Sequence, residues 1–235
     1  MTRLCACLLA TLVSFACTAT EEPLSVSSPD GRLTVHFALD DGAPTYSVTR
    51  DERVVIRPSR LGFEFQGLPA LAGGLEVATT ARATQDETWE QPWGETRLVR
   101  DHHHELTVSL QESGGAKRRF DIVFRAFDDG VAFRYRVPEQ EGLGDVLVRD
   151  ELTEFALTGD HEAWWIGAYQ DNRYEYLYEA TKVGAIDKVH TPFTMKASDD
   201  LYLAIHEAAL VDYASMTLAR GPDHTLECDL VPWAD

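Results

Sequence analysis

The sequence predicts an all-β protein, built as one large antiparallel β-sandwich. Three observations lead to this fold class. Short runs in which apolar and polar residues alternate follow one another along the chain, separated by clusters of Gly, Pro, Asn and Asp. No long apolar segment with a 3.6-residue period appears after the N-terminal region. The chain has 235 residues without an internal repeat or low-complexity tract, which suits one large domain.

The first two predicted strands lie between residues 32 and 49. Turns are predicted at residues 29–31 and 40–42, where Pro, Asp and Gly cluster. The apolar positions that alternate along the two runs are Leu33, Val35, Phe37, Tyr46 and Val48. In the next segment, we expect Pro58 to separate two short strands, because proline cannot donate a hydrogen bond to a sheet.

The strongest hairpin signal is the stretch "FDIVFRAFDDGVAFRYRV", which ends at Val137. Asp128, Asp129 and Gly130 interrupt two alternating runs, and we expect Gly130 to take the positive φ of a tight hairpin turn. The apolar face of the second strand is predicted to consist of Val131, Phe133, Tyr135 and Val137.

The N-terminal residues "MTRLCACLLATLVSFAC" have the pattern of an export signal. Arg3 precedes an apolar stretch that is too short for a confident membrane span, so we interpret residues 1–16 as a signal peptide. The box that ends at Cys17 resembles a lipoprotein cleavage site, so Cys17 is either a lipid anchor or part of a linker, 17–24. We expect an exported protein, in the periplasm or anchored to the outer membrane, that meets the membrane through this anchor alone.

A disulfide framework is not expected in the folded part of the chain. Of the four cysteines, Cys5 and Cys7 would leave with the signal peptide, and Cys228 alone would remain in the sandwich. The hydrophobic core must therefore stabilise the fold without cross-links, and the chain is long enough to bury one.

The composition limits the classes of partner. The chain carries 21 Lys and Arg against 39 Asp and Glu, a formal net charge of -18. Nucleic acids and anionic lipids are therefore not expected as partners, because binding to phosphates requires clustered Lys and Arg. The surplus of carboxylates is compatible with a hard cation such as Ca²⁺, although a solvated acidic surface explains most of it.

The cluster "DHHHELT" leaves two interpretations open. On a strand, His102 and His104 would point to one face, as two ligands of a zinc site do. Leu106 and Val108 share that face, which favours structural or surface histidines, and no third ligand is identifiable. The sequence contains no nucleophile elbow, P-loop, dinucleotide fingerprint or HExxH motif.

Adjacent tryptophans mark a further candidate site. Trp164 and Trp165 cannot both point inward from a strand, so we expect one of them to face a cleft or another domain. Carboxylates are abundant, yet no pair can be nominated as the acid and base of a glycosidase. No catalytic residue is therefore assigned.

Several phrases, taken together, resemble the N-terminal region of glycoside hydrolase family 97. They are "SPDGRLTVHF", "FRAFDDGVAFRYRV", "AWWIGAYQDNRYEYLYE", "TPFTMKASDDLYLAIHEAALVDYASMTL" and "VPWAD". They keep the family's order from about Ser25 to the end of the chain. The resemblance implies an enzyme that acts on α-linked glucosides or galactosides, with an N-terminal β-super-sandwich, a central (β/α)₈ catalytic barrel and a small C-terminal β domain.

Under this resemblance, residues 25–235 form the super-sandwich, which we expect to be truncated at its C-terminus. The barrel that would carry the catalytic acid and base is absent from this chain, so the chain should be inactive alone. Its expected partners are an α-linked oligosaccharide and the catalytic barrel of the same polypeptide. The choice between glucoside and galactoside, the linkage and the stereochemistry stay open.

The resemblance also assigns site residues. It aligns Tyr174 and Glu175 with a Tyr-Glu pair that binds calcium in the family, so Glu175 is the expected Ca²⁺ ligand, whereas Glu179 is expected to be solvated. We expect Glu207 to lie in a polar network at the exit of a strand. The residues expected to contact substrate are Asn172, Trp164, His206 and Glu207.

An alternative of a different class is a complete, non-catalytic carbohydrate-binding lipoprotein module. It would use the same aromatic side chains to stack on sugar rings. A stop codon directly after codon 235 would favour the module, and a continuing reading frame with alternating strands and helices would favour the enzyme.

Overall fold

The structure is a computed structural model that describes residues 24–141, 143–171 and 175–232. It confirms the predicted all-β fold class, because nearly all regular elements in these ranges are strands. The two 3₁₀ helices in these ranges are Val183–Ala185 (η1) and Pro222–His224 (η2). No described helix is long and apolar enough to cross a membrane.

The strands pair in antiparallel fashion throughout the described residues. In chain order they are β1 (Ser25–Ser27), β2 (Leu33–Asp40), β3 (Ala43–Arg50), β4 (Arg53–Arg60), β5 (Phe63–Phe65), β6 (Leu75–Glu90), β7 (Leu98–Glu112), β8 (Arg119–Ala126), β9 (Val131–Arg136), β10 (Val148–Glu151), β11 (Glu154–Leu157), β12 (Glu162–Trp165), β13 (Glu179–Lys182), β14 (Lys188–His190), β15 (Phe193–Ser198), β16 (Leu201–Ile205), β17 (Met216–Arg220) and β18 (Thr225–Leu230).

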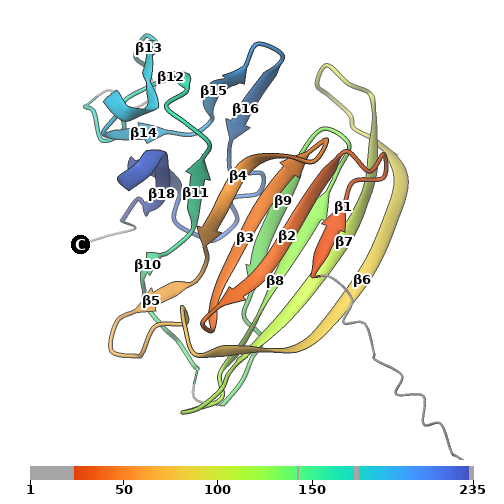
Figure 1. The fold of residues 1–235 in the computed structure, drawn as a ribbon, viewed down its shortest axis with the longest axis vertical. Helices are drawn as coiled ribbons and strands as arrows, with labels where there is room; N and C mark the ends of the chain where they lie inside the picture. Colours follow the sequence, from red (N-terminus) through yellow and green to blue (C-terminus); the bar gives the residue numbers. More distant parts are fainter. Residues whose placement is uncertain (1–23, 142, 172–174, 233–235) are drawn as a thin grey trace, which may run out of the picture.

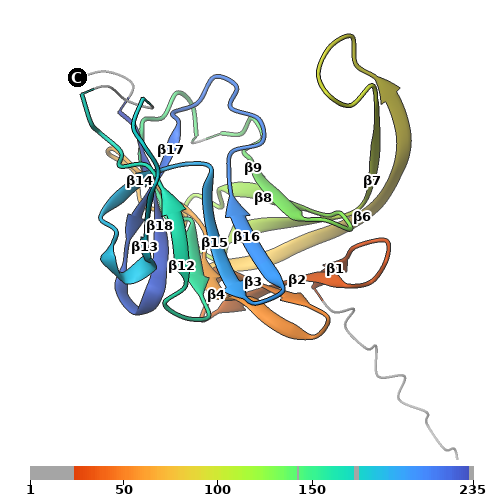
Figure 2. The ribbon, with the colours of Figure 1, turned by 90° about the horizontal axis from the view of Figure 1, so that it is seen from above.

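One long sheet is opposed by two smaller sheets (Figure 1). The long sheet has eight strands in the order β1-β2-β3-β4-β11-β18-β17-β14. The four-stranded sheet β6-β7-β8-β9 packs against its first half, as Figure 2 shows, and the four-stranded sheet β13-β12-β15-β16 packs against its second half. This arrangement is the predicted large sandwich, with two packed regions that share one sheet.

Each packed region has its own hydrophobic core. Buried side chains of the first core include Val35, Phe37, Tyr46, Val48, Leu106, Val108, Leu110, Phe120, Ile122 and Phe124. Those of the second core include Leu157, Val183, Val189, Phe193, Met195, Leu218 and Leu226. The five alternating positions predicted in the first two strands are all buried, which confirms their inward orientation. Each such large apolar side chain stabilises the fold by roughly 1.5–3 kcal/mol.

The predicted hairpin of β8 and β9 is confirmed, with a different turn. Phe133 and Tyr135 pack against the first core as expected. Gly130 does not have the expected positive φ. The connection has four residues and is closed by a hydrogen bond from Phe127 N–H to the Gly130 carbonyl (2.8 Å), and such a turn does not require a left-handed glycine. Val137 lies beyond β9 and is exposed rather than on the buried face.

The expected break at Pro58 is wrong, because β4 continues through this residue. The pairing of β4 with β3 changes register around it, and proline is tolerated at such irregular positions. The buried Ser59 hydroxyl donates to the Arg57 carbonyl (2.8 Å) and accepts a hydrogen bond from Ala156 N–H (2.9 Å). This side chain therefore joins β4 to β11 where the backbone pairing is irregular.

The histidine cluster lies where β7 extends beyond the first core. His102 and His104 are half-buried, and His104 Nδ1 is 2.9 Å from the Ser27 carbonyl oxygen. The buried histidine is His103, on the opposite face, with its Nδ1 hydrogen-bonded to Asp101. No group of three or more potential metal ligands occurs among the described residues. A zinc site at this cluster therefore has no support within those residues.

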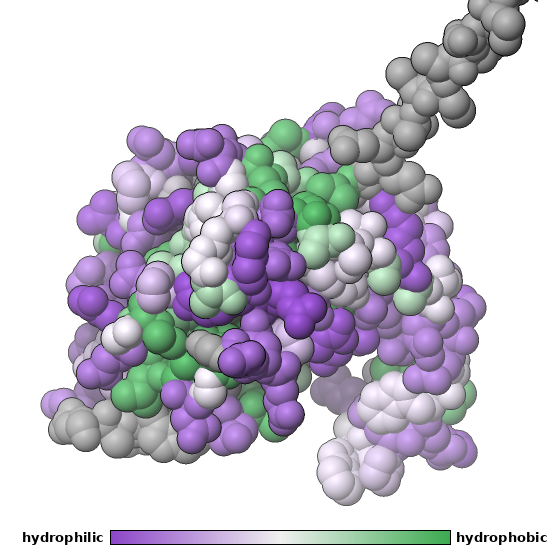
Figure 3. Space-filling model, turned by 90° about the horizontal axis from the view of Figure 1, so that it is seen from below, coloured by the Kyte–Doolittle hydropathy of each residue, from purple (hydrophilic) through white to green (hydrophobic). Residues whose placement is uncertain are grey.

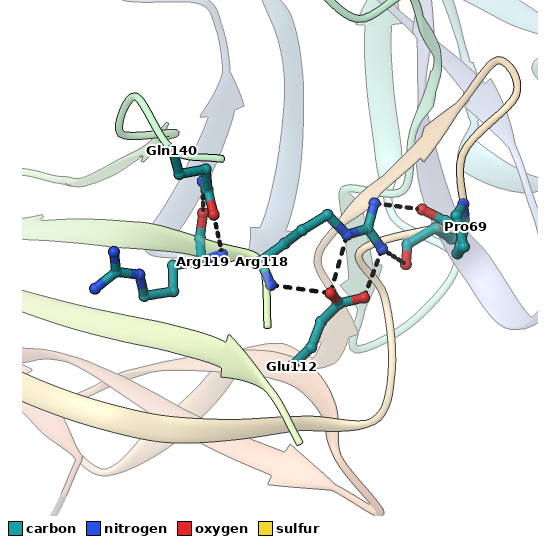
Figure 4. Close-up of polar contacts among 6 residues, drawn as sticks. Pro69, Glu112, Arg118, Arg119 and Gln140 are labelled. Carbon is teal, nitrogen blue, oxygen red and sulfur yellow. Dashed lines mark hydrogen bonds and ion pairs between the residues drawn. The ribbon is translucent and has the colours of Figure 1, made fainter. Parts of the chain in front are cut away.

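A buried arginine connects the turn between β7 and β8 to the segment that follows β5 (Figure 4). Arg118 forms an ion pair with Glu112 at 2.5 Å and donates to the carbonyl oxygens of Pro69 (2.8 Å) and Ala70 (3.3 Å). The hydrogen bonds from Arg118 lower the pKa of the Glu112 carboxyl, although burial opposes this effect. These contacts fix the segment that carries Leu71, a fully buried residue of the first core.

We expect Ser59→Ala to lower the free energy of unfolding by about 1–3 kcal/mol, because the buried Ala156 N–H loses its acceptor. Ser47→Ala on the neighbouring strand β3 is the matched control, and it should change stability by less than about 0.5 kcal/mol. Urea denaturation of both variants measures the difference. Equal losses in the two variants would show that the Ser59 hydroxyl does not stabilise the junction.

Candidate functional site

A hollow of about 780 Å³ lies beside the second half of the long sheet. We call it the aromatic hollow. Its walls come from the end of β12, residues 167–170, residues 176–178, the first residue of β13, and Asp187 with the first residue of β14. Its lining includes Trp165, Tyr169, Tyr176, Tyr178, Glu179 and Lys188. Aromatic walls with a few charged groups suit a small organic ligand or contact with another domain.

Asp229 on β18 holds two of the lining side chains in place. Its carboxylate accepts hydrogen bonds from the Tyr169 hydroxyl (2.8 Å), the Lys188 ammonium (2.9 Å) and the Thr217 hydroxyl (3.0 Å). Burial acts to raise the pKa of Asp229, but these three hydrogen bonds outweigh it and lower the pKa. The Lys188 nitrogen also lies 5.3 Å from the centre of the Tyr169 ring, a cation–π contact.

Trp164 and Trp165 lie on opposite faces of β12, as adjacent strand residues do. Trp165 packs against the second core, lines the aromatic hollow and donates from Nε1 to the Thr181 hydroxyl (2.9 Å). Trp164 lies on the other face, with its ring centre 6.0 Å from that of Tyr202. Of the two tryptophans, it is therefore Trp165 that the structure places in the aromatic hollow, while Trp164 belongs to a separate aromatic pair.

The expected calcium ligand lies next to the aromatic hollow. Glu175 is exposed and directly precedes Tyr176, the first of four consecutive lining residues. Glu179, the last of these four, is exposed and pairs with Trp165 across β13 and β12. Asn172, expected to contact substrate, lies outside the described residues.

The rim of the aromatic hollow carries exposed apolar side chains. Leu177 is 92% exposed, Tyr178 is 60% exposed and Tyr169 is 50% exposed. A contiguous apolar surface of this kind usually marks an interaction site, because leaving it in water costs free energy. This part of the surface is therefore a candidate contact with another domain or with a ligand.

Glu207 lies directly beyond β16, as expected for a residue at the exit of a strand. Its carboxylate accepts a hydrogen bond from Met216 N–H at 2.9 Å and so closes the loop of residues 206–215. The expected polar contact of Glu207 is therefore present. His206 is exposed. Contact of either residue with a sugar stays a prediction.

A chain of hydrogen bonds lies near Glu207. The Glu151 carboxylate accepts hydrogen bonds from the hydroxyls of Thr153 (2.7 Å) and Tyr213 (2.9 Å), and Thr153 is in turn hydrogen-bonded to Tyr135 (2.7 Å). Burial raises the pKa of Glu151, and the nearby Glu207 carboxylate raises it further, although the two hydroxyls act in the opposite direction. The net effect is a raised pKa.

We expect Glu151→Gln to weaken the dependence of stability on pH. A raised pKa means that the folded state binds protons more tightly than the unfolded state. The resulting stabilisation is complete below the unfolded glutamate pKa of about 4.3 and is lost as the pH rises through the folded pKa. As the pH rises from about 4.3 through the raised pKa of folded Glu151, the melting temperature of the wild type should therefore fall relative to that of Glu151→Gln.

The control is Glu162→Gln, which changes an exposed glutamate on β12. It should keep the pH dependence of the wild type in the same thermal melts. Parallel curves for the wild type and Glu151→Gln would contradict a raised pKa at Glu151.

Sequence reasoning missed Asp229, Lys188 and Glu151. Lys188 and Asp229 are 41 residues apart, and Glu151 and Tyr213 are 62 residues apart. No motif or local period marks a carboxylate whose hydrogen-bond donors come from distant parts of the chain. These residues become visible only when the strands are placed side by side.

Comparisons with known proteins agree with this architecture. A family model described as Glycosyl-hydrolase 97 N-terminal matches residues 26–233. A probable retaining alpha-galactosidase from Streptomyces bingchenggensis is 34% identical over 206 residues, which cover 81% of this chain and 31% of the relative. A retaining alpha-galactosidase from Bacteroides thetaiotaomicron is 24% identical over 234 residues, which cover 94% of this chain and 33% of the relative.

A solved structure of a glycoside hydrolase family 97 enzyme from Pseudoalteromonas sp. strain K8, in complex with panose, superposes with a TM-score of 0.86. The two proteins are 40% identical, and the match covers 89% of this chain and 32% of that chain. The chain thus spans about a third of the length of these relatives. Because the family model matches almost all of the sandwich, the chain belongs to glycoside hydrolase family 97 and corresponds to the N-terminal domain of its enzymes.

Proposed function

We propose that this chain is the N-terminal domain of an exported α-glycoside hydrolase and that it supports the catalytic barrel of that enzyme. The observation that carries the proposal is the match of residues 26–233 to the family's N-terminal model, together with coverage of about a third of each relative. The signal-peptide pattern of residues 1–16 supports export to the periplasm, and a lipid on Cys17 would anchor the protein to the outer membrane.

The proposed substrate is an α-linked oligosaccharide. Two relatives are named alpha-galactosidases, and structures of the Pseudoalteromonas enzyme contain panose or acarbose. The apolar rim of the aromatic hollow, with Leu177 and Tyr178 at its centre, supports burial of this surface against the barrel. The residues of this chain proposed to contact the substrate are Asn172, Trp164, His206 and Glu207.

We further propose that Glu175 supplies one ligand to a Ca²⁺ ion at the contact with the barrel. Its carboxylate is exposed beside the aromatic hollow, and an anionic oxygen suits a hard cation. Calcium takes about six to eight oxygen ligands, and the described residues contain no group of three potential ligands. The remaining protein ligands would therefore come from the barrel. A bound Ca²⁺ would polarise the glycosidic oxygen or orient a catalytic carboxylate.

The second candidate function is a non-catalytic carbohydrate-binding module. The aromatic lining of the hollow supports it, because Trp165, Tyr169 and Tyr178 offer ring faces for sugar stacking. The DNA downstream of codon 235 distinguishes the two candidates. A frame that continues into alternating strands and helices supports the enzyme, and an immediate stop codon supports the module.

We expect the purified 235-residue chain to release no nitrophenol from aryl α-galactosides or aryl α-glucosides. No acid and base pair can be nominated within it, and general acid catalysis needs such a pair flanking the glycosidic bond. A spectrophotometric assay measures the release, with a polypeptide that includes the barrel as the active control. Turnover by the chain alone would overturn the assignment of catalysis to the barrel.

In the enzyme that includes the barrel, we expect Glu175→Gln to weaken Ca²⁺ binding by about tenfold or more, because an anionic ligand becomes neutral. Glu179→Gln changes a second exposed glutamate of the same segment and should leave the affinity unchanged. Calorimetric calcium titration of both variants tests the difference. Equal affinities of Glu175→Gln and the wild type would remove Glu175 from the site.

A further inference from the structure

The sheet β6-β7-β8-β9 carries a second hollow on the face that points away from the first core. Figure 2 shows β6 and β7 curving away from β1 and β2, so this face is the inner side of the curve. In Figure 3 the hairpin forms a lobe that stands apart from the main body. The hollow has a volume of about 340 Å³, and we call it the hairpin hollow. Its lining includes Gln85, Glu87, Asp101, His103, Glu105 and Arg125.

The register of β6 and β7 places an exposed tryptophan beside this hollow. Glu87 pairs with Asp101, and Trp89 pairs with Val99 one step nearer the hairpin tip. Alternate residues of a strand share a face, so Trp89 lies on the same face as Glu87. Trp89 is 49% exposed. Its ring therefore provides an aromatic surface next to the polar hollow.

Two of the polar side chains in the hairpin hollow are held in fixed positions. His103 is 3% exposed, its Nδ1 is hydrogen-bonded to Asp101, and its ring centre lies 4.9 Å from that of Phe127. In the neutral tautomer that donates Nδ1–H to Asp101, the Nε2 atom is an acceptor, and no described residue hydrogen-bonds to it. The guanidinium of Arg125 donates to Glu105 at 2.8 Å. Side chains fixed in this way lose little entropy when a ligand binds.

The chemistry of these groups selects the class of ligand. The lining contains three carboxylates, Glu87, Asp101 and Glu105, against the single guanidinium of Arg125, so the hollow disfavours phosphates and other anions. Ala83 is the one apolar residue in the lining of the hollow, which therefore offers little apolar area for a lipid or a protein hot spot. A neutral molecule with many hydroxyls matches the mixture of donors and acceptors, and its apolar ring face matches an indole.

We propose that the hairpin hollow is an oligosaccharide-binding site, with Trp89 stacking on a sugar ring and the polar side chains binding its hydroxyls. The site is separate from the aromatic hollow and requires no residue of the barrel. It would hold a polymeric or oligomeric α-glycan on the domain without taking part in hydrolysis. The proposal therefore goes beyond the assignment of the chain to a glycoside hydrolase and does not depend on the calcium site.

The test is calorimetric titration of the 235-residue chain with maltotriose and, separately, with raffinose, an α-glucosyl and an α-galactosyl probe. We expect saturable binding of at least one probe and a loss of about tenfold in affinity in Trp89→Ala. Trp89→Phe keeps an aromatic face and should retain most of the affinity. Comparison of this variant with Trp89→Ala separates the loss of ring stacking from a folding defect. The control Thr88→Ala changes an exposed residue on the opposite face of β6 and should bind as the wild type does.

A Tyr169→Ala variant distinguishes the two hollows. If it leaves binding intact while Trp89→Ala weakens it, the hairpin hollow is the site. If Tyr169→Ala abolishes binding and Trp89→Ala does not, the sugar binds in the aromatic hollow and the proposal is wrong. Absence of saturable binding of both probes to the wild-type chain would also overturn it, without bearing on the membership of the chain in an enzyme.

Discussion

The contact between β4 and β11 unites the two halves of the sandwich. β11 lies between β4 and β18, yet just two of its residues, Ala156 and Leu157, pair with β4 through the backbone. Side chains complete the junction. The Arg57 guanidinium donates to the Leu157 carbonyl at 2.7 Å, and Arg60 forms an ion pair with Glu154 at 2.6 Å. Because each core lies under a different half of the long sheet, this junction sets the position of one core relative to the other.

The junction also separates two kinds of surface. Strands beyond it carry the aromatic hollow, which is lined by side chains of β12, β13 and β14 and is anchored by Asp229. Strands of the first core carry the β6–β7 hairpin, which extends past that core and exposes Trp89. A rigid sandwich can therefore present one surface to a catalytic domain while a second surface remains available to a glycan. The strands hold the side chains of both surfaces in fixed positions, because sites on regular elements are positioned more precisely than sites on loops.

Two half-buried carboxyls illustrate how the fold sets charge. Burial alone would raise both pKa values, yet that of Asp229 is lowered and that of Glu151 is raised. Asp229 faces the positive Lys188 and two hydroxyls, so its ionised form is stabilised. At Glu151 burial is the largest effect and the negative Glu207 adds to it, so the two hydroxyl donors do not prevent a raised pKa. The balance between burial and the charge of the partners therefore decides the direction.

The sequence by itself determined the fold class, the inward faces of β2, β3 and β9, the hairpin of β8 and β9, and the family. The family follows from the resemblance of several phrases taken together, whereas the structural features follow from patterns local to each strand, because a half-buried strand shows its buried face as a two-residue period. Only the tertiary structure decided that β4 continues through Pro58, that His103 is buried, and that Asp229 anchors side chains of the hollow that Trp165 lines. The reason is physical: each of these features depends on the register of strands that are distant in the chain, and a local pattern carries no information about which strands become neighbours.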